Sequence, residues 1–209
     1  MVGEHSEADT TSTAAATSGA GAGNQAISAR SAATVGISDR DGFLVECLRD
    51  SRYHEDRERY FARWHKVAMF VVVVSGTATF ANWASLQWIG AVVTIAGLLD
   101  LVFDVSGKAR LHASLRRRIY DIMAQMEDPS RPLEHLREQI VRVYADEPPT
   151  MHAANYVAFN GAMEFLSRPR KFQYKLKWYH RVFRNVCSFA STEFKTNAES
   201  ATPKGAATG

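Results

Sequence analysis

Charged residues are absent from the stretch Val67–Leu99, although they are dense on either side of it. Two apolar runs fill this region, VAMFVVVVSGTATFANW over about 67–83 and LQWIGAVVTIAGLLDLVF over about 86–103. A helix that spans a bilayer needs about 20 mostly apolar residues, because the hydrocarbon core is about 30 Å thick and each helical residue rises about 1.5 Å. The pattern therefore predicts two short antiparallel transmembrane helices over 67–103, joined by a tight turn near Trp83 at the far interface. The alternative is a buried hairpin in a soluble helical protein.

The residues before this hairpin, 38–66, predict one charged helix that runs directly into the first apolar run. Ser38, followed three residues later by Asp41, has the form of an N-terminal capping box, in which the hydroxyl accepts backbone N–H groups at the start of a helix. Upstream, residues 1–37 are rich in Ala, Ser, Thr and Gly and cannot bury enough apolar surface to offset the entropy of ordering. We predict that this segment and the polar C-terminal segment 193–209 are disordered tails.

After the hairpin, residues 104–167 show the periodicity of amphipathic helices separated by prolines. Helices are predicted over about 107–127 and 133–144, with apolar residues at spacings of four and three, and over about 151–166. Short proline-marked turns between such helices predict a small antiparallel bundle, so the predicted fold is all-α. The apolar stripes of the first two helices consist of Leu111, Leu115, Ile119, Ile122, Met126, Leu136, Ile140 and Val143.

The segment 168–192 combines basic and aromatic residues and predicts a last amphipathic helix from Arg170 to about Ala190. Three roles are open for it. It lies on an anionic membrane surface, it packs on the bundle with its basic residues solvated, or it binds nucleic acid, which is disfavoured because no nucleic-acid-binding module surrounds it. The candidate membrane-surface residues are Lys171, Lys175, Lys177, Arg181 and Arg184.

Basic residues at both ends of the hairpin predict its orientation. Lys and Arg next to membrane-spanning helices stay on the cytoplasmic side. Lys66 before the hairpin and Lys108 after it therefore predict that both termini are cytoplasmic. The net charge of +3 is too small to require a nucleic-acid partner. Cys47 and Cys187 have neither metal-ligand nor disulfide spacing, which favours a reducing compartment.

Small residues predict a packing seam within the hairpin. Gly90, Thr94 and Gly97 share one face of the second apolar helix, and Gly76 in the first could lie opposite them. Small residues at such spacing let membrane helices approach closely. Two interpretations are open: the seam packs the two legs of one hairpin, or it also joins neighbouring subunits.

Asp100 and Asp104 lie four residues apart at the inner end of the second apolar run. On a continuous helix they would share one face. A carboxylate at the bilayer centre is costly, so such residues usually face water or a partner. One interpretation is an interfacial charge pair, with Lys108 one turn beyond Asp104. The other is an acidic ring that lines a pore.

The sequence contains no recognised catalytic or metal-binding motif. Its seven histidines fall in no H-E-x-x-H or Cys/His ligand spacing, and no phosphate loop, nucleophile elbow or dinucleotide fingerprint occurs. For His112, among basic residues just beyond the hairpin, an interfacial or packing role is favoured over catalysis. We expect a protein that is not an enzyme and has no metal and no cofactor.

The order of several short motifs around the hairpin resembles the SLATT family, which comprises two-transmembrane domains found beside SMODS nucleotidyltransferases or SLOG sensor domains in bacterial conflict systems. The likeness covers about residues 53–166. It consists of RERYFARWHK before the hairpin, DVSGKARLHASLRRRIYDI after it, the element DEPPT, and one asparagine in the next helix. The resemblance assigns structural or regulatory roles to Lys108, Arg110, His112, Leu115, Glu147, Pro148 and Asn160.

The resemblance also implies a function. A SLATT-like protein is expected to be a pore-forming effector of antiviral defence, a homo-oligomer that permeabilises the inner membrane when a nucleotide messenger synthase or a sensor protein, encoded nearby, supplies a signal. The alternative is a non-conducting membrane anchor whose cytoplasmic helices recruit a soluble partner. This chain departs from the family in its long N-terminal tail and its basic aromatic C-terminal segment, and it contains no recognisable sensor domain.

Overall fold

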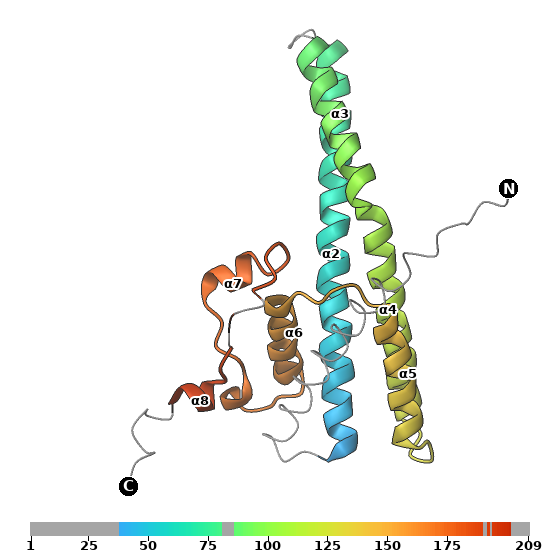
Figure 1. The fold of residues 1–209 in the computed structure, drawn as a ribbon, viewed down its shortest axis with the longest axis vertical. Helices are drawn as coiled ribbons and strands as arrows, with labels where there is room; N and C mark the ends of the chain where they lie inside the picture. Colours follow the sequence, from blue (N-terminus) through green and yellow to red (C-terminus); the bar gives the residue numbers. More distant parts are fainter. Residues whose placement is uncertain (1–37, 81–85, 190–191, 193, 202–209) are drawn as a thin grey trace, which may run out of the picture.

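The computed structural model describes residues 38–80, 86–189, 192 and 194–201 (Figure 1). Helices account for 78% of these residues, and their only β-type pairing is an isolated bridge between Tyr174 and Thr196, which confirms the all-α prediction. The predicted tails 1–37 and 202–209 and the predicted turn around Trp83 lie outside the described residues. The helices are α2 (Asp39–Phe80), α3 (Leu86–Phe103), α4 (Val105–Met126), α5 (Leu133–Ala145), α6 (His152–Phe165), the 3₁₀-helix η1 (Arg170–Phe172), α7 (Trp178–Val182) and α8 (Asn197–Ala201).

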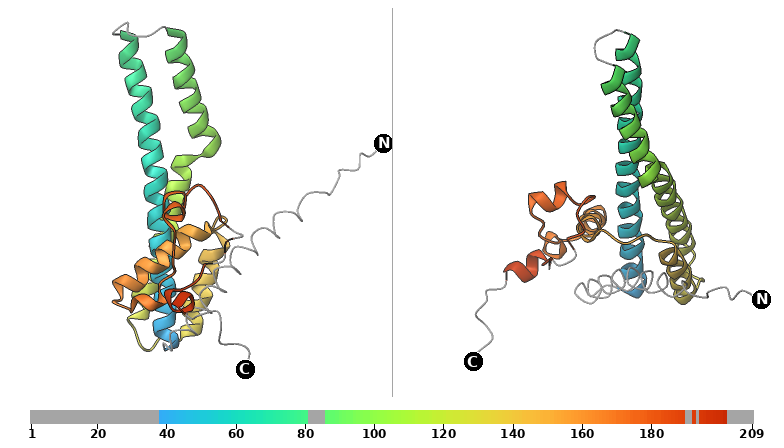
Figure 2. Two further views of the ribbon diagram at one scale, coloured as in Figure 1. Left: turned by 90° about the vertical axis from the view of Figure 1, so that its left-hand side faces the viewer. Right: turned by 45° about the horizontal axis from the view of Figure 1, so that its top comes forward.

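The long helix α2 runs the length of the molecule (Figure 1). Its 42 residues form one α-helix, about 63 Å long at 1.5 Å per residue. As predicted, the Ser38 hydroxyl caps this helix by accepting the backbone N–H of Asp41 at 3.2 Å. The negative charges of Asp39 and Asp41 in the first turn also interact favourably with the positive end of the helix dipole. The first half of α2 belongs to a helical bundle and its second half to a hairpin with α3 (Figure 2).

In the hairpin, the second half of α2 and α3 lie side by side. The less exposed residues recur at spacings of three and four on both helices, which is the spacing of left-handed coiled-coil packing. These residues are His65, Ala68, Val72 and Ser75 on α2, and Ile89, Val93, Ala96 and Asp100 on α3.

Large apolar side chains cover the outside of both legs of the hairpin. By length and composition, one stretch of the described chain could cross a membrane: Gln87–Met126, which comprises nearly all of α3 and α4. The apolar run of α2 is too short to meet the same length and composition requirement, because it starts at Val67 and is described only to Phe80. The exposed apolar residues of the two legs are Val67, Met69, Phe70, Val73, Val74, Trp88, Val92, Ile95, Leu98, Leu99, Leu101, Val102 and Phe103.

In the bundle, the first half of α2 packs against α4 on one side and α6 on the other, and α5 covers α4 (Figure 1). The predicted apolar stripes of α4 and α5 are buried here, except that Leu111 is partly exposed. The main core consists of Phe43, Cys47, Leu115, Ile119, Ile122, Met126, Leu136, Ile140, Val143 and Tyr144. A second core, under the C-terminal segment, consists of Val45, Ala153, Phe159, Met163, Tyr174 and Phe194.

A sharp break separates α3 from α4. Asp104 adopts a left-handed conformation with φ 42° and ψ 53°, and its carboxylate accepts the backbone N–H of Gly107 at 3.1 Å. A Cβ atom added at Gly107 would collide with that carboxylate, so the capping contact depends on glycine at this position. The prediction that Asp100 and Asp104 share one face of a continuous helix is therefore wrong, because the helix ends between them.

The prediction of a single amphipathic helix over 168–192 is also wrong. The chain forms η1, then an extended segment through Tyr174, then the short helix α7. The Asn160 side chain accepts the backbone N–H of Tyr174 at 2.7 Å and donates to its carbonyl at 2.8 Å, so these groups are not available to a helix. The tail prediction fails for 194–201 as well, because Phe194 is buried and α8 forms.

The variant Gly107→Ala is expected to lower the free energy of unfolding by about 1–2 kcal/mol, because the new methyl group displaces the Asp104 carboxylate from its capping position. Thermal unfolding in detergent, followed by far-ultraviolet circular dichroism, measures this change. The matched control is Gly97→Ala, where an added Cβ meets no atom within 4 Å. A Gly107→Ala protein that melts at or above the wild-type temperature would contradict the assignment of this cap.

Candidate functional site

A buried polar network lies in the bundle, around the middle of α2. Burying a polar or charged group is costly unless it is paired, so a cluster of such groups inside a small bundle requires an explanation beyond packing. The network draws on α2, α4, α6 and the linker between α5 and α6. Its members with exposures of at most 7% are Arg49, Asp50, Ser51, His54, Arg57, His112, Glu147 and Asn155.

Two histidines join α2 to α4 at the centre of this network. The Nδ1 atoms of His54 and His112 are 2.9 Å apart, so one neutral ring donates a hydrogen bond and the other accepts it. Phe61 stacks on His112, with ring centroids 5.7 Å apart and planes at 12°. Burial, with a smaller contribution from Arg57, lowers the pKa of His54 to about 3. Burial, His54 and Arg57 lower the pKa of His112 to about 3, so both rings are neutral at pH 7.

The linker before α6 is held against the same stretch of α2. The Glu147 carboxylate lies 3.9 Å from His54 Nε2, and both side chains are almost fully buried. Tyr53 precedes His54 on α2, and its hydroxyl accepts the backbone N–H of Met151 at 3.1 Å. Burial raises the pKa of Tyr53 to about 12, so it stays a neutral phenol at physiological pH. The histidine pair and this linker therefore form one contact across three parts of the chain.

A second set of polar contacts lies one turn nearer the start of α2. Arg49 Nε donates to Asp50 Oδ1 at 2.7 Å. The Tyr144 hydroxyl donates to the other oxygen of Asp50 at 2.6 Å and lies 2.9 Å from Glu46 Oε1. Burial, together with the neighbouring Asp50, raises the pKa of Tyr144. These contacts fix the end of α5 against α2.

On its other side, the network holds the C-terminal segment. Arg57 Nη1 donates to the backbone carbonyl of Asn185 at 2.9 Å, and the guanidinium lies 4.6 Å from the centroid of the Phe61 ring. Next to it, Arg184 Nη2 and Asp56 Oδ2 are 3.2 Å apart. The turn after α7 is thus fastened to α2 by two adjacent residues.

The residues predicted to line a pore do not come together as a ring in this single chain. Asp100 is half-buried against α2, where its Oδ1 lies 3.4 Å from His65 Nδ1. Asp104 is the N-cap of α4, and its carboxylate accepts from Gly107, not from Lys108. Each carboxylate therefore has a local structural role.

The predicted glycine seam does not pack the two legs together. A Cβ atom added at Gly76, Gly90 or Gly97 would meet no atom within 4 Å. Gly90, Thr94 and Gly97 are exposed, on a flank of α3 beside the face that meets α2. The interpretation that this seam joins the legs of one hairpin is wrong, because the legs meet through the adjacent face, which contains Val93.

The residues singled out by the SLATT resemblance occupy different environments. His112 and Leu115 are buried against α2, and Glu147 is buried beside His54. Pro148 is half-buried next to it, and Asn160 holds the backbone of the C-terminal segment through Tyr174. Lys108 and Arg110 are exposed on α4.

Of the candidate membrane-surface residues, four are exposed and one is not. Lys171, Lys175, Lys177 and Arg181 face solvent, whereas Arg184 is partly buried in its ion pair with Asp56.

Sequence reasoning missed His54 and Arg57, which connect these positions. Both lie on the buried face of α2 that begins at Phe43 and Cys47, and the spacing of four and three continues through them. Polar residues occupy several positions of this face, so a search for apolar periodicity does not detect it.

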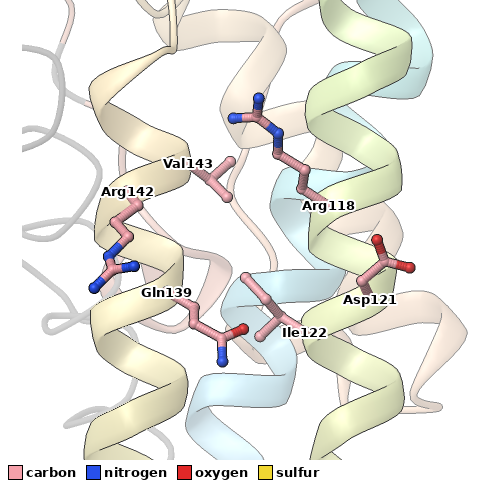
Figure 3. A pocket seen from close by; sticks show the side chains of 6 residues that line it. All are labelled: Arg118, Asp121, Ile122, Gln139, Arg142 and Val143. Atoms are coloured by element: carbon pink, nitrogen blue, oxygen red, sulfur yellow. The ribbon is translucent and has the colours of Figure 1, made fainter.

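A shallow groove lies between α4 and α5 (Figure 3). Its two basic side chains are already paired, Arg118 with Asp146 and Arg142 with Glu138, the latter at 2.6 Å. Among the described residues, no group of three or more His, Cys, Asp or Glu side chains could hold a metal ion. The lining residues are Arg118, Asp121, Ile122, Gln139, Arg142 and Val143.

Comparison with family models, with curated proteins and with solved structures finds no match to this chain. The resemblance to the SLATT family therefore stays a prediction from the short motifs.

The histidine pair predicts an acid-sensitive fold. The unfolded chain binds protons at the ordinary histidine pKa of about 6.5, whereas the folded chain does not until about pH 3. Stability due to these groups is therefore complete above pH 6.5 and is lost as the pH falls toward 3, with a limiting slope of about 1.4 kcal/mol per pH unit for each histidine. Chemical denaturation at pH 7.5, 6.5, 5.5 and about 4.5 measures this slope.

His112→Gln removes one of the two groups and is expected to make the pH dependence between 6.5 and 4.5 shallower than in the wild-type protein. The matched control is His135→Gln, because the His135 side chain is 58% exposed and its substitution leaves the slope unchanged. Parallel pH profiles for His112→Gln and wild type would rule out the buried pair as the source of the acid sensitivity.

Proposed function

We propose that this chain is a two-span protein of the bacterial inner membrane that assembles through its hairpin and, when activated, permeabilises the membrane. The observation that carries the proposal is the apolar outer surface of both legs. Transfer of each large apolar side chain out of water contributes about 1.5–3 kcal/mol. Thirteen of them are exposed along the described parts of the legs, at 42–78%. At these exposures, leaving them in water would forgo about 10–20 kcal/mol of transfer free energy. That amount is comparable with the roughly 5–15 kcal/mol by which whole domains are stable, so a bilayer is the environment that fits them.

The charges at the two ends of the hairpin support an orientation with both termini in the cytoplasm. Arg63 and Lys66 are exposed just before the apolar part of α2, and Lys108 and Arg110 are exposed just after α3. Positive residues of this kind remain on the cytoplasmic side. The bundle would then lie entirely beneath the inner leaflet.

The direction of the small residues on α3 supports assembly. Gly90, Thr94 and Gly97 lie exposed on a flank of α3, beside the face that meets α2, so they offer a flat strip to a neighbouring copy. Small residues on such a strip allow close helix contact in a membrane, where association depends on packing rather than on the hydrophobic effect. A ring of hairpins joined in this way is the proposed permeabilising form, in the manner that the SLATT resemblance implies.

The continuous helix α2 supports a route for activation. It contains both the polar network of the bundle and the first leg of the hairpin. A displacement of the bundle against α2 would therefore act directly on the leg. We propose that the signal comes from a partner protein, a nucleotide messenger synthase or a sensor encoded nearby, and that the response belongs to a bacterial or phage conflict system.

One observation favours a second function, a non-conducting membrane anchor that recruits a soluble partner through its bundle. Asp100 is turned toward α2, and the outward faces of the legs are mainly apolar. Such a surface suits lipid contact and offers few polar groups to a conducting path.

A measurement of membrane potential distinguishes the permeabilising function from the anchor function. Expression in a bacterial host together with the neighbouring genes of its locus, with a potential-sensitive dye as readout, is expected to depolarise the cells once the signal is present. The variant Gly97→Ile is expected to abolish depolarisation, because its side chain keeps neighbouring hairpins apart. Ala91→Ile is the matched control, since Ala91 is small and exposed on an adjacent face of α3.

Two outcomes would overturn parts of this proposal. Release of the protein from membranes by alkaline carbonate would reject the two-span topology. A membrane-inserted protein that leaves the potential unchanged even with the signal present would reject permeabilisation and support the anchor.

A further inference from the structure

A cluster of exposed apolar side chains lies on α7 and the turn that follows it. We name this cluster, with its two basic neighbours, the α7 face: Lys177, Trp178, Arg181, Val182, Phe183 and Val186. Trp178 is 72% exposed and Val182 and Val186 are each 62% exposed. The opposite side of the same segment is packed, since His180 is buried between the rings of Phe189 and Phe194. The α7 face is therefore held in place by the fold, and the described part of the chain leaves it uncovered.

The charged residues of the chain segment that carries the α7 face are all positive. No Asp or Glu occurs between Phe165 and Thr192, although the segment contains seven Lys and Arg residues. Arg184 is paired with Asp56 on α2, but Lys177 and Arg181 are exposed among the apolar residues. Tryptophan beside Lys and Arg is the combination that favours a bilayer interface, because the indole ring and apolar side chains enter the headgroup level while the cations meet anionic lipids.

The position of the α7 face along α2 brings it near the proposed membrane. Contacts from Arg184 and Asn185 fasten the turn after α7 to Asp56 and Arg57. These lie eleven and ten residues before Val67, or about 15–17 Å along the helix. The headgroup layer occupies about 5–7 Å of that distance, and transmembrane helices lean by about 20° on average, which brings one side of the bundle closer.

The ribbon views agree with this placement. In Figure 1 and in the left view of Figure 2, α7 lies nearer the hairpin than α8 does. Within the C-terminal segment, the part that carries the exposed apolar side chains is thus the part on the hairpin side.

We propose that the α7 face docks on the surface of the anionic inner leaflet, beside the inserted hairpin of the same chain. The proposal rests on the proposed two-span topology. It replaces the predicted amphipathic helix with a short, pre-formed face. It makes the bundle a unit attached to the bilayer at two places, through the hairpin and through α7. The lipid contact at α7 would then influence the position of the bundle helices relative to α2.

The test uses the one exposed cysteine of the described chain. Cys187 is exposed and adjoins Val186, whereas Cys47 is buried, so a thiol-reactive, environment-sensitive dye labels Cys187 in the full-length protein. The labelled protein is reconstituted at one copy per lipid nanodisc, in phosphatidylcholine alone or with about 30% phosphatidylglycerol as the anionic lipid. A small fraction of lipid carries a nitroxide at its headgroup, which quenches a dye at the surface.

In anionic nanodiscs, the dye emission is expected to shift to the blue and to be quenched, and both effects are expected to be weaker in phosphatidylcholine. The double variant Lys177→Glu with Arg181→Glu is expected to weaken the contact by at least about 30-fold, which returns the signal to the phosphatidylcholine level. The matched control is Arg117→Glu with Arg137→Glu, which makes the same change in net charge at exposed positions on α4 and α5. It is expected to leave the quenching unchanged.

The outcomes separate this proposal from the proposed topology. A chain that does not enter nanodiscs rejects the two-span topology. A chain that enters them but shows equal, weak quenching in both lipid compositions overturns docking and leaves the topology intact. Quenching that both double variants reduce equally also overturns it, because general charge attraction then explains the signal. Protection of the dye by added RNA, without quenching in anionic nanodiscs, would assign the α7 face to nucleic acid instead.

Discussion

The contact between one face of α2 and its neighbours is the interaction on which the rest of the structure depends. This face packs on α4 in the bundle and on α3 in the hairpin, so a single helix carries both halves of the molecule. Along this face, residues recur at alternating steps of four and three, except for two consecutive steps of four between Arg57 and His65, where the bundle meets the hairpin. Such spacing keeps the contacting residues on one side of a long helix. The residues of this face are Phe43, Cys47, Asp50, His54, Arg57, Phe61, His65, Ala68, Val72 and Ser75.

The middle of this face is polar, which is expensive for a small bundle. Neutral His54 and His112 share one hydrogen bond, and Asp50 is paired with Arg49 and Tyr144, so specific partners offset part of the cost of burial. Apolar side chains of similar volume would stabilise the bundle at least as well. The polar groups instead select one arrangement of α4, α5 and the linker around α2, immediately before the helix enters the hairpin. In the proposed function, this placement suits control over the hairpin.

The two legs are connected to the bundle in different ways. The first leg continues α2 without interruption, whereas the second is separated from α4 by Asp104 in a left-handed conformation. That conformation costs of order 1–3 kcal/mol for a residue other than glycine. The cap that Asp104 makes with the backbone of Gly107 offsets part of this cost. One leg is thus rigidly coupled to the bundle and the other is jointed, so rearrangements between bundle and hairpin would concentrate at the joint.

The sequence by itself determined the features that depend on local periodicity: the two apolar runs, the Ser38 cap and the buried stripes of α4 and α5, since an amphipathic helix shows its pattern within a few turns. Only the tertiary structure decided features that depend on a distant partner. Asn160 binds the backbone of Tyr174, so the C-terminal segment does not form one helix. Gly90 and Gly97 are exposed because another face of α3 meets α2. His54 is buried because His112 lies opposite it. Each of these outcomes depends on residues that are far apart in the chain, so no local pattern contains it.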